Sequence, residues 1–216
     1  MNISVLGAGS WGTALAVLLC ENGHTVTIWS IDPKEVDMIE TKREQVDKLP
    51  GVRIPEQIAV TTDLQKAIEN REMLVLAVPS IFVRSTAKNM AAYVEDGQLI
   101  VNVAKGIEES TLLNMTDVIE DEIPNAKVGV LSGPSHAEEV GRRMPTTIVA
   151  GARDKKTAEV IQDAFMNPYF RVYTSPDMVG IELGAALKNV IALAAGIVDG
   201  LGYGDNTKAA LITRGI

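Results

Sequence analysis

The chain is 216 residues long, with 46% hydrophobic residues, 22% charged residues and a formal net charge of -8. This length and composition match an ordinary globular protein of one or two domains, and the acidic balance argues against a nucleic-acid partner held by a basic surface. The single cysteine, Cys20, excludes an intramolecular disulfide and fits a reducing, cytoplasmic setting.

A glycine motif separates the first predicted strand, residues 3–6, from the first predicted helix, residues 13–21. Gly7, Gly9 and Gly12 have the spacing G-x-G-x-x-G, which in this context makes a tight turn, lets a pyrophosphate approach the backbone and lets the helix pack closely on the strand. Free amides at the helix start then face the anion. The pattern predicts a dinucleotide site, with a ligand-free glycine turn as the alternative.

Short apolar runs alternate with helical segments through the rest of the first 175 residues. The further predicted strands are residues 25–29, 73–78, 99–104, 128–132, 147–151 and 170–174. The further predicted helices are residues 33–42, 63–69, 81–94, 110–122, 135–143 and 154–166. This alternation is typical of a parallel sheet covered on both faces, so residues 1–175 are predicted to form a doubly wound, Rossmann-type α/β domain. Residues 44–55 are expected to form an irregular connection.

The composition changes at Pro176, after which alanine, glycine and leucine dominate. Residues 176–216 are predicted to begin an all-α C-terminal domain. The apolar stretch 183–198 is shorter than the about 20 residues of a membrane span, so we expect a buried helix and no membrane insertion. No secretory leader is expected, and the helical pattern of residues 206–216 predicts that the sequence is a fragment of a longer protein.

Ligands of open α/β sheets bind beyond the carboxyl ends of the strands. An ammonium at such a position, Lys105, is therefore interpreted as functional, although a solvated loop lysine is the alternative. Pro79 limits the turn after its strand, and the short residue that follows leaves room for a cofactor. Neither histidine has metal-ligand partners at useful spacing, so no metal site is predicted. The candidate residues at strand ends are Ser10, Trp11, Pro79, Lys105, Gly133, Ser135 and His136.

Lys188 lies in the middle of an apolar helical pattern. In one interpretation its stem packs and its charged head reaches water. In the other, its ammonium is partly desolvated in a cleft, which lowers its pKa toward the range of a general acid. Its same-face neighbours at helical spacing are small or apolar, which favours the second interpretation. They are Ile181, Gly184, Ala185, Ile191, Ala192 and Ala195.

Several segments together resemble the NAD(P)-dependent glycerol-3-phosphate dehydrogenases: GAGSWGTALA, VPS, VAKGIE, LSGPSHAEEV and ALKNVIALAAGIVDGLGYGDNTKAALITRG. The resemblance runs from the first residue to the last. It implies reversible reduction of dihydroxyacetone phosphate to sn-glycerol 3-phosphate, which feeds glycerophospholipid synthesis. It also implies that Lys188 is the catalytic lysine. The implied substrate contacts are Lys105, Gly133, Ser135, Lys188 and Asn189, and the implied cofactor contacts beside the glycine motif are Ser10, Trp11, Lys105 and Ala137.

The chemistry agrees with these implied roles. Hydride arriving at a ketone carbon leaves an alkoxide that needs a proton, which Lys188 can supply. A dianionic phosphate needs local cations in an acidic protein, and Lys105 is one. The family's arginine–asparagine pair, and an aspartate that assists the lysine, are expected beyond Ile216.

Two positions depart from the family pattern. Asp32 stands about 20 positions after the glycine motif, near where many relatives have an arginine, which favours a free ribose 2′-hydroxyl and therefore NAD over NADP. Alternatively, Asp32 caps the helix that follows Pro33. His136 replaces a residue that is commonly phenylalanine in relatives, which argues against a catalytic histidine.

Two further functions stay open. One alternative is a dinucleotide-binding module that lacks turnover, and the other is a related dehydrogenase of hydroxy acids or sugar acids. The expected partner is a small phosphorylated substrate, without nucleic acid, and a homodimer is left open.

Overall fold

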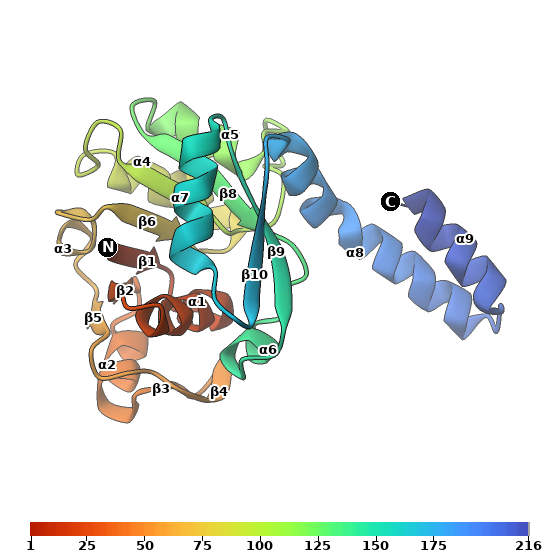
Figure 1. The fold of residues 1–216 in the computed structure, drawn as a ribbon, viewed down its shortest axis with the longest axis horizontal. Helices are drawn as coiled ribbons and strands as arrows, with labels where there is room; N and C mark the ends of the chain where they lie inside the picture. Colours follow the sequence, from red (N-terminus) through yellow and green to blue (C-terminus); the bar gives the residue numbers. More distant parts are fainter. Residues whose placement is uncertain (216) are drawn as a thin grey trace.

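The predicted apolar strands assemble into one eight-stranded sheet in the computed structural model, which describes residues 1–215 (Figure 1). The strand order is β10-β9-β8-β7-β6-β1-β2-β5, so the chain returns to the centre of the sheet after β5 and continues on the other side of β1. Ligands of doubly wound sheets bind at such a switch point, here between β1 and β6. The strands are β1 (Asn2–Leu6), β2 (Thr25–Trp29), β5 (Ala59–Thr61), β6 (Met73–Leu76), β7 (Leu99–Asn102), β8 (Lys127–Ser132), β9 (Thr146–Ala152) and β10 (Phe170–Ser175).

The sheet changes direction after β8. Every pair of neighbouring strands in the part of the sheet that runs from β5 through β2, β1, β6 and β7 to β8 is parallel. In contrast, β9 runs antiparallel to β8, and β10 runs parallel to β9. The prediction of a parallel sheet is therefore confirmed except for the pair β8–β9, because apolar runs do not encode strand direction. As a consequence, β9 begins at the edge of the sheet where β1, β6, β7 and β8 end.

Helices cover both faces of the sheet, and the strands alternate between two cores. Met73 and Val75 of β6 belong to the buried cluster that includes α1 and α7, whereas Leu74 and Leu76 belong to the cluster that includes α3, α4 and α5. This two-sided burial explains the continuous apolar runs. The helices of this domain are α1 (Ser10–Glu21), α2 (Pro33–Lys42), α3 (Leu64–Ile68), the 3₁₀ turn η1 (Ser80–Phe82), α4 (Val83–Met90), α5 (Met115–Glu122), α6 (Ala137–Gly141) and α7 (Lys155–Phe165).

Three local predictions differ from the structure. The segment 44–55 is not irregular throughout, because β3 (Glu44–Gln45) and β4 (Leu49–Arg53) pair as a small antiparallel sheet. The strand β5 was not predicted, since its three residues are too short to give a period. The helix expected from residue 110 begins only at Met115, because Leu112 has a φ of +61° and turns the chain.

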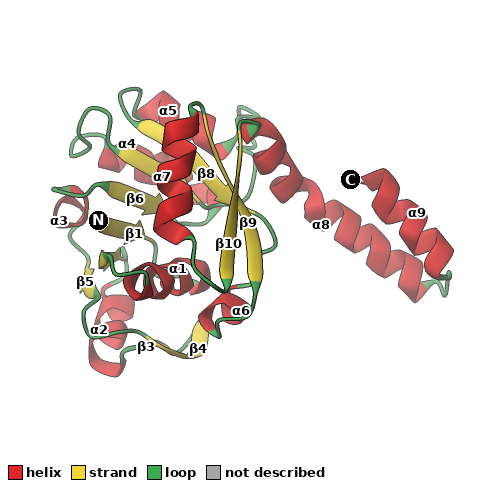
Figure 2. Cartoon of the chain, viewed as in Figure 1, coloured by secondary structure: helices red, strands yellow, loops and turns green. Residues whose placement is uncertain are grey.

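The predicted helical segment consists of α8 (Met178–Gly200) and α9 (Asp205–Gly215). The first turns of α8 contact the sheet domain, and the rest of α8 projects away from it together with α9 (Figure 2). Ile216, the last residue of the second predicted helix, lies outside the described residues. The expectation of a buried helix is wrong here, because Glu182 is the one buried residue of α8. Contacts with β9 and α9 cover some apolar side chains in part, among them Ile181 and Ile191, but several large ones stay exposed. The exposed ones include Leu187, Val190, Leu193 and Ile197.

The glycine motif packs β1 against α1 and β6. Gly7 has a φ of +124°, and a Cβ there would lie 2.8 Å from the carbonyl carbon of Ala77. A Cβ on Gly12 would overlap the carbonyl oxygen of Gly7, whereas a Cβ on Gly9 would meet no described atom within 4 Å. The first and third glycines are thus needed by the fold itself, and the second faces open space.

We therefore expect opposite outcomes from two matched substitutions. Gly12→Ala places a methyl group inside a backbone contact and should lower the free energy of unfolding by about 1–3 kcal/mol or more. Gly9→Ala adds the same group in open space and should change it by no more than about 0.5 kcal/mol. Urea unfolding of both variants measures this difference, and equal losses would contradict the packing described.

Candidate active site

A cleft of about 940 Å³ lies beyond the carboxyl ends of β1, β2, β6 and β7. The glycine loop forms one wall, and α1 begins there without a side-chain cap on its first amides. Trp11 Nε1 is buried and has no hydrogen-bond partner among the described residues. Uncapped amides, the open space at Gly9 and an unpaired donor fit a bound dinucleotide, whose pyrophosphate needs such donors. The predicted residues lining this cleft are Gly7, Gly9, Ser10, Trp11, Asp32, Pro79, Lys105, Ser135, His136 and Ala137.

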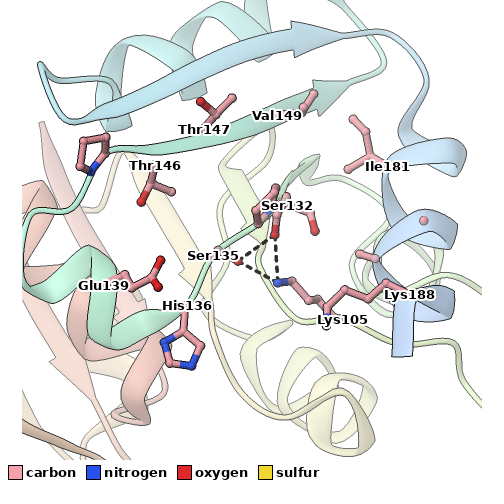
Figure 3. A pocket seen from close by; sticks show the side chains of 15 residues that line it. Lys105, Ser132, Ser135, His136, Glu139, Thr146, Thr147, Val149, Ile181 and Lys188 are labelled. Atoms are coloured by element: carbon pink, nitrogen blue, oxygen red, sulfur yellow. Dashed lines mark hydrogen bonds between the residues drawn. The ribbon is translucent and has the colours of Figure 1, made fainter. Parts of the chain in front are cut away.

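A second cavity, of about 780 Å³, adjoins this cleft (Figure 3). It lies between the turn after β8, the start of β9 and the first turns of α8. Lys105, Ser135 and His136 line both spaces, whereas Lys188 lines only the second. The two cavities together can hold a dinucleotide and a smaller molecule side by side.

Lys105 stands at the junction of the two cavities. Its Nζ donates hydrogen bonds to the carbonyl oxygen of Gly133, at 3.2 Å, and to Ser135 Oγ, at 2.7 Å. Burial lowers the pKa of Lys105, and the nearby ammonium of Lys188 lowers it further. The structure therefore brings three of the residues predicted to bind substrate into direct contact.

Lys188 reaches the second cavity from α8, opposite Lys105 (Figure 3). Its Nζ donates a hydrogen bond of 2.7 Å to Oδ1 of the neighbouring Asn189. The side chain is exposed, so the expectation of a partly desolvated ammonium is wrong for the described residues. Asn189 is exposed as well and does not line either cavity.

Asp32 caps α2 and also lines the nucleotide cleft. Its Oδ1 accepts a hydrogen bond of 2.9 Å from the amide of Lys34, which caps α2, and its side chain also lines the nucleotide cleft. Nearby, Glu35 accepts a hydrogen bond of 2.6 Å from Ser30 Oγ and pairs with Lys48. Two carboxylates and one ammonium thus lie near the end of β2, and of these Glu35 and Lys48 were not predicted.

His136 precedes α6 and is exposed, with Nδ1 2.9 Å from a carboxylate oxygen of Glu138. It lines both cavities but makes no described contact with either lysine, which leaves the prediction against a catalytic histidine unchanged. Ala137 is the first residue of α6, and Pro79 precedes η1 at the end of β6, as the strand pattern indicated.

Two parts of the chain match models of one enzyme family. Residues 2–158 match the model of the NAD-dependent glycerol-3-phosphate dehydrogenase N-terminus, and residues 177–216 match the model of its C-terminus. The chain belongs to the NAD-dependent glycerol-3-phosphate dehydrogenase family. This confirms the resemblance stated from the segments GAGSWGTALA to ALITRG.

Individual relatives agree with this membership. The chain is 65% identical to a glycerol-3-phosphate dehydrogenase [NAD(P)+] of Agathobacter rectalis and 59% identical to one of Fusobacterium nucleatum. These two matches include 99% and 100% of the chain, respectively. A crystal structure of glycerol-3-phosphate dehydrogenase from Coxiella burnetii superposes with a TM-score of 0.92 at 34% identity over 99% of the chain and 66% of that structure. The chain spans 64% and 65% of the two relatives' lengths.

The family match also bears on the apolar helix α8. By length and composition alone, Met178–Gly200 is long and apolar enough to cross a membrane. The same residues fall within the match to the C-terminal part of the dehydrogenase family. Its apolar character is therefore accounted for by the family's helical part, in agreement with the helical domain predicted from Pro176 onward.

Sequence patterns missed an ion cluster that anchors the Lys105 segment. Arg84 of α4 forms a bidentate pair with Glu108, at 2.7 and 2.8 Å, and also contacts Asp121 and Glu122 of α5. Glu108 lies three residues after Lys105, and it also accepts a hydrogen bond from Thr111. The charges of this cluster come from three separate segments, so no local spacing reveals it.

This cluster predicts a specific acid sensitivity. The Arg84 guanidinium, with help from Thr111, lowers the pKa of Glu108 to about 2. Because this value lies below that of the unfolded chain, the ionised carboxylate stabilises the fold above about pH 4.5, and the stabilisation is lost as the pH falls toward about 2. We expect the urea midpoint to fall more steeply over this interval in the unmodified chain than in Glu108→Gln.

The neighbouring exposed Glu109→Gln is the matched control, since it changes the net charge equally. Its pH profile should follow that of the unmodified chain. Parallel profiles for Glu108→Gln and Glu109→Gln would refute the assignment of this acid sensitivity to the Arg84 cluster.

Proposed function

We propose that the protein interconverts dihydroxyacetone phosphate and sn-glycerol 3-phosphate by hydride transfer with NAD(P)H. One observation carries this proposal: two lysines from different parts of the fold face one cavity that opens into the nucleotide cleft (Figure 3). Family membership supports it, since the relatives' names state this activity and both types of coenzyme.

A bound nicotinamide coenzyme would supply the hydride that the carbonyl carbon receives. In the proposed reaction Lys188 donates a proton from Nζ to the carbonyl oxygen, which becomes the hydroxyl of the product, and in the reverse direction it accepts that proton. Lys105 binds the substrate and offers a positive charge to its phosphate. The hydrogen bonds from Lys105 to Gly133 and Ser135 hold this ammonium at the junction of the two cavities.

Lys188→Ala tests this mechanism in the protein at its natural length. Loss of the proton donor should lower kcat by about 10²- to 10⁴-fold, the usual contribution of a general acid. The Kd for NADH, measured by fluorescence titration, should stay nearly unchanged because Lys188 does not line the nucleotide cleft.

Lys156→Ala is the control, because Lys156 is exposed on α7. Turnover of Lys188→Ala equal to that of this control would eliminate the proposed mechanism. Binding of NADH by the unmodified protein without any turnover would instead support the module alternative.

We further infer that NADH is preferred over NADPH. The support is the carboxylate of Asp32, which lines the nucleotide cleft at the end of β2 and would repel a 2′-phosphate. Lys48 brings an opposing charge to this end of the cleft, but it is paired with Glu35. The preference therefore depends on Asp32 keeping its charge while it caps α2.

Asp32→Ser separates these two roles, because serine is also a favourable N-cap residue. The substitution should leave the melting temperature nearly unchanged and raise kcat/KM for NADPH relative to NADH by about 2- to 5-fold, the size of an exposed charge interaction of up to about 1 kcal/mol. Asp37→Ser, on the same helix but outside the cleft, should leave the ratio unchanged. An unmodified protein that strongly prefers NADPH would refute the inference.

The alternative of a related hydroxy-acid dehydrogenase has weaker support. Likenesses to a UDP-glucose dehydrogenase and a pyrroline-5-carboxylate reductase are 18% and 15% identical and show the fold alone. Turnover of unphosphorylated ketones in preference to dihydroxyacetone phosphate would favour this alternative. Three further statements stay predictions from the sequence: a role in glycerophospholipid synthesis, a cytoplasmic setting and the lack of a metal. A homodimer stays open.

A further inference from the structure

The burial pattern of α8 is inverted. Leu193 and Ile197, which are apolar, are 68% and 55% exposed, whereas the carboxylate-bearing Glu182 is 4% exposed. Buried carboxylates are rare unless they are hydrogen-bonded or paired. A carboxylate that is buried on an otherwise exposed apolar helix therefore indicates a specific contact.

Glu182 accepts hydrogen bonds from the start of α5. One carboxylate oxygen accepts from the amide of Thr116, at 3.0 Å, and the other accepts from the Thr116 hydroxyl. The amide belongs to the first turn of α5, where backbone donors have no partner inside the helix, and the helix dipole favours a negative charge there. Burial raises the pKa of Glu182, which the hydrogen bonds from Thr116 oppose.

The same carboxylate contacts the segment that carries Lys105. Asn102, the last residue of β7, donates from Nδ2 to Glu182 Oε1 at 3.3 Å. Its side-chain amide also binds the backbone of Ala104: Oδ1 accepts from the Ala104 amide at 3.0 Å, and Nδ2 donates to the Ala104 carbonyl oxygen at 3.1 Å. Asn102 thereby fixes the chain directly before Lys105.

Glu182 and Lys188 lie six residues apart on the same helix, which corresponds to a rise of about 9 Å. Between them, no residue of α8 is buried. The other packing of α8 against the sheet domain is also at its start, where Ile181 and Met178 lie against Gly151 of β9. Among the described side-chain hydrogen bonds that join α8 to the sheet domain, those of Glu182 therefore lie nearest to Lys188.

We propose that Glu182 is a positioning residue that holds Lys188 opposite Lys105 by joining α8 to Asn102 and Thr116. An apolar anchor would let α8 slide or rotate, whereas a carboxylate with donors on both oxygens fixes both motions. The catalytic part of this inference rests on the proposed function. Its mechanical part concerns only how α8 sits on the sheet domain.

The catalytic test uses Glu182→Ala and Glu182→Gln in the protein at its natural length. Misplacement of a reacting group by about 1 Å can cost about 100-fold in rate. We expect kcat per active site to fall about 10- to 100-fold in Glu182→Ala, with partial rescue in Glu182→Gln, whose side-chain oxygen can still accept from the Thr116 amide. The Kd for NADH should stay unchanged, and Glu40→Gln on the exposed face of α2 is the control.

A merely structural role gives a different result. In that case the variants lose folded protein and melting temperature, but kcat per active site, counted by NADH binding, equals that of the control. This outcome would overturn the catalytic part of the proposal.

The mechanical test does not need activity. Spin labels are attached at Val190→Cys in α8 and Ser110→Cys in the loop after Lys105, both exposed positions, with Cys20 replaced by alanine. The distance distribution between the labels should be narrow with Glu182 and markedly broader in Glu182→Gln and Glu182→Ala. Distributions of equal width overturn the proposal, whereas broadening in a protein that does not reduce dihydroxyacetone phosphate refutes only the proposed function.

Discussion

The close approach between Gly12 of α1 and the carbonyl of Gly7 is the constraint on which the rest of the site depends. Because no side chain separates the two backbones, α1 starts directly over the end of β1 and its uncapped amides face the cleft. Gly7 makes the same kind of contact with β6 through Ala77. The nucleotide cleft is therefore placed at the switch point between β1 and β6 by packing alone, before any ligand contributes.

The reversal of direction at β9 builds the second cavity beside this cleft. If β9 were parallel to β8, the chain would first have to cross back to the edge of the sheet where β8 begins. Instead, β9 starts where β8 ends, and β9 and β10 both run toward the edge where β8 begins. There α8 starts against Gly151, and its next turns pass the second cavity, which Ile181 and Lys188 line. Lys105 and Lys188 thus come from distant segments and still meet, which concentrates positive charge in a protein with a net charge of -8.

Local sequence patterns predicted the parts of the fold that depend on interactions between residues close together in the sequence. The alternation of apolar runs and helices predicted the domain, and the spacing of Gly7, Gly9 and Gly12 predicted the turn that the structure contains. Strand direction at β9, the burial of α8 and the Arg84 cluster were not predictable, because each depends on which distant segments become neighbours. Glu182 did leave a signal, as an acidic residue among the apolar first turns of α8, but its partners Asn102 and Thr116 lie far away in the sequence.

Lys188 and Glu182, six residues apart on α8, differ in exposure: the ammonium is exposed, whereas the carboxylate is buried. In the proposed reaction the ammonium of Lys188 reaches the substrate, and because its side chain is exposed, its own packing cannot fix it. The rigidity must then come from elsewhere on the same helix. Because backbone hydrogen bonds make α8 stiff over a few turns, a buried and hydrogen-bonded carboxylate about 9 Å away can hold the ammonium without covering it. The buried carboxylate of Glu182 and the exposed ammonium of Lys188 would therefore act together, the first positioning the second.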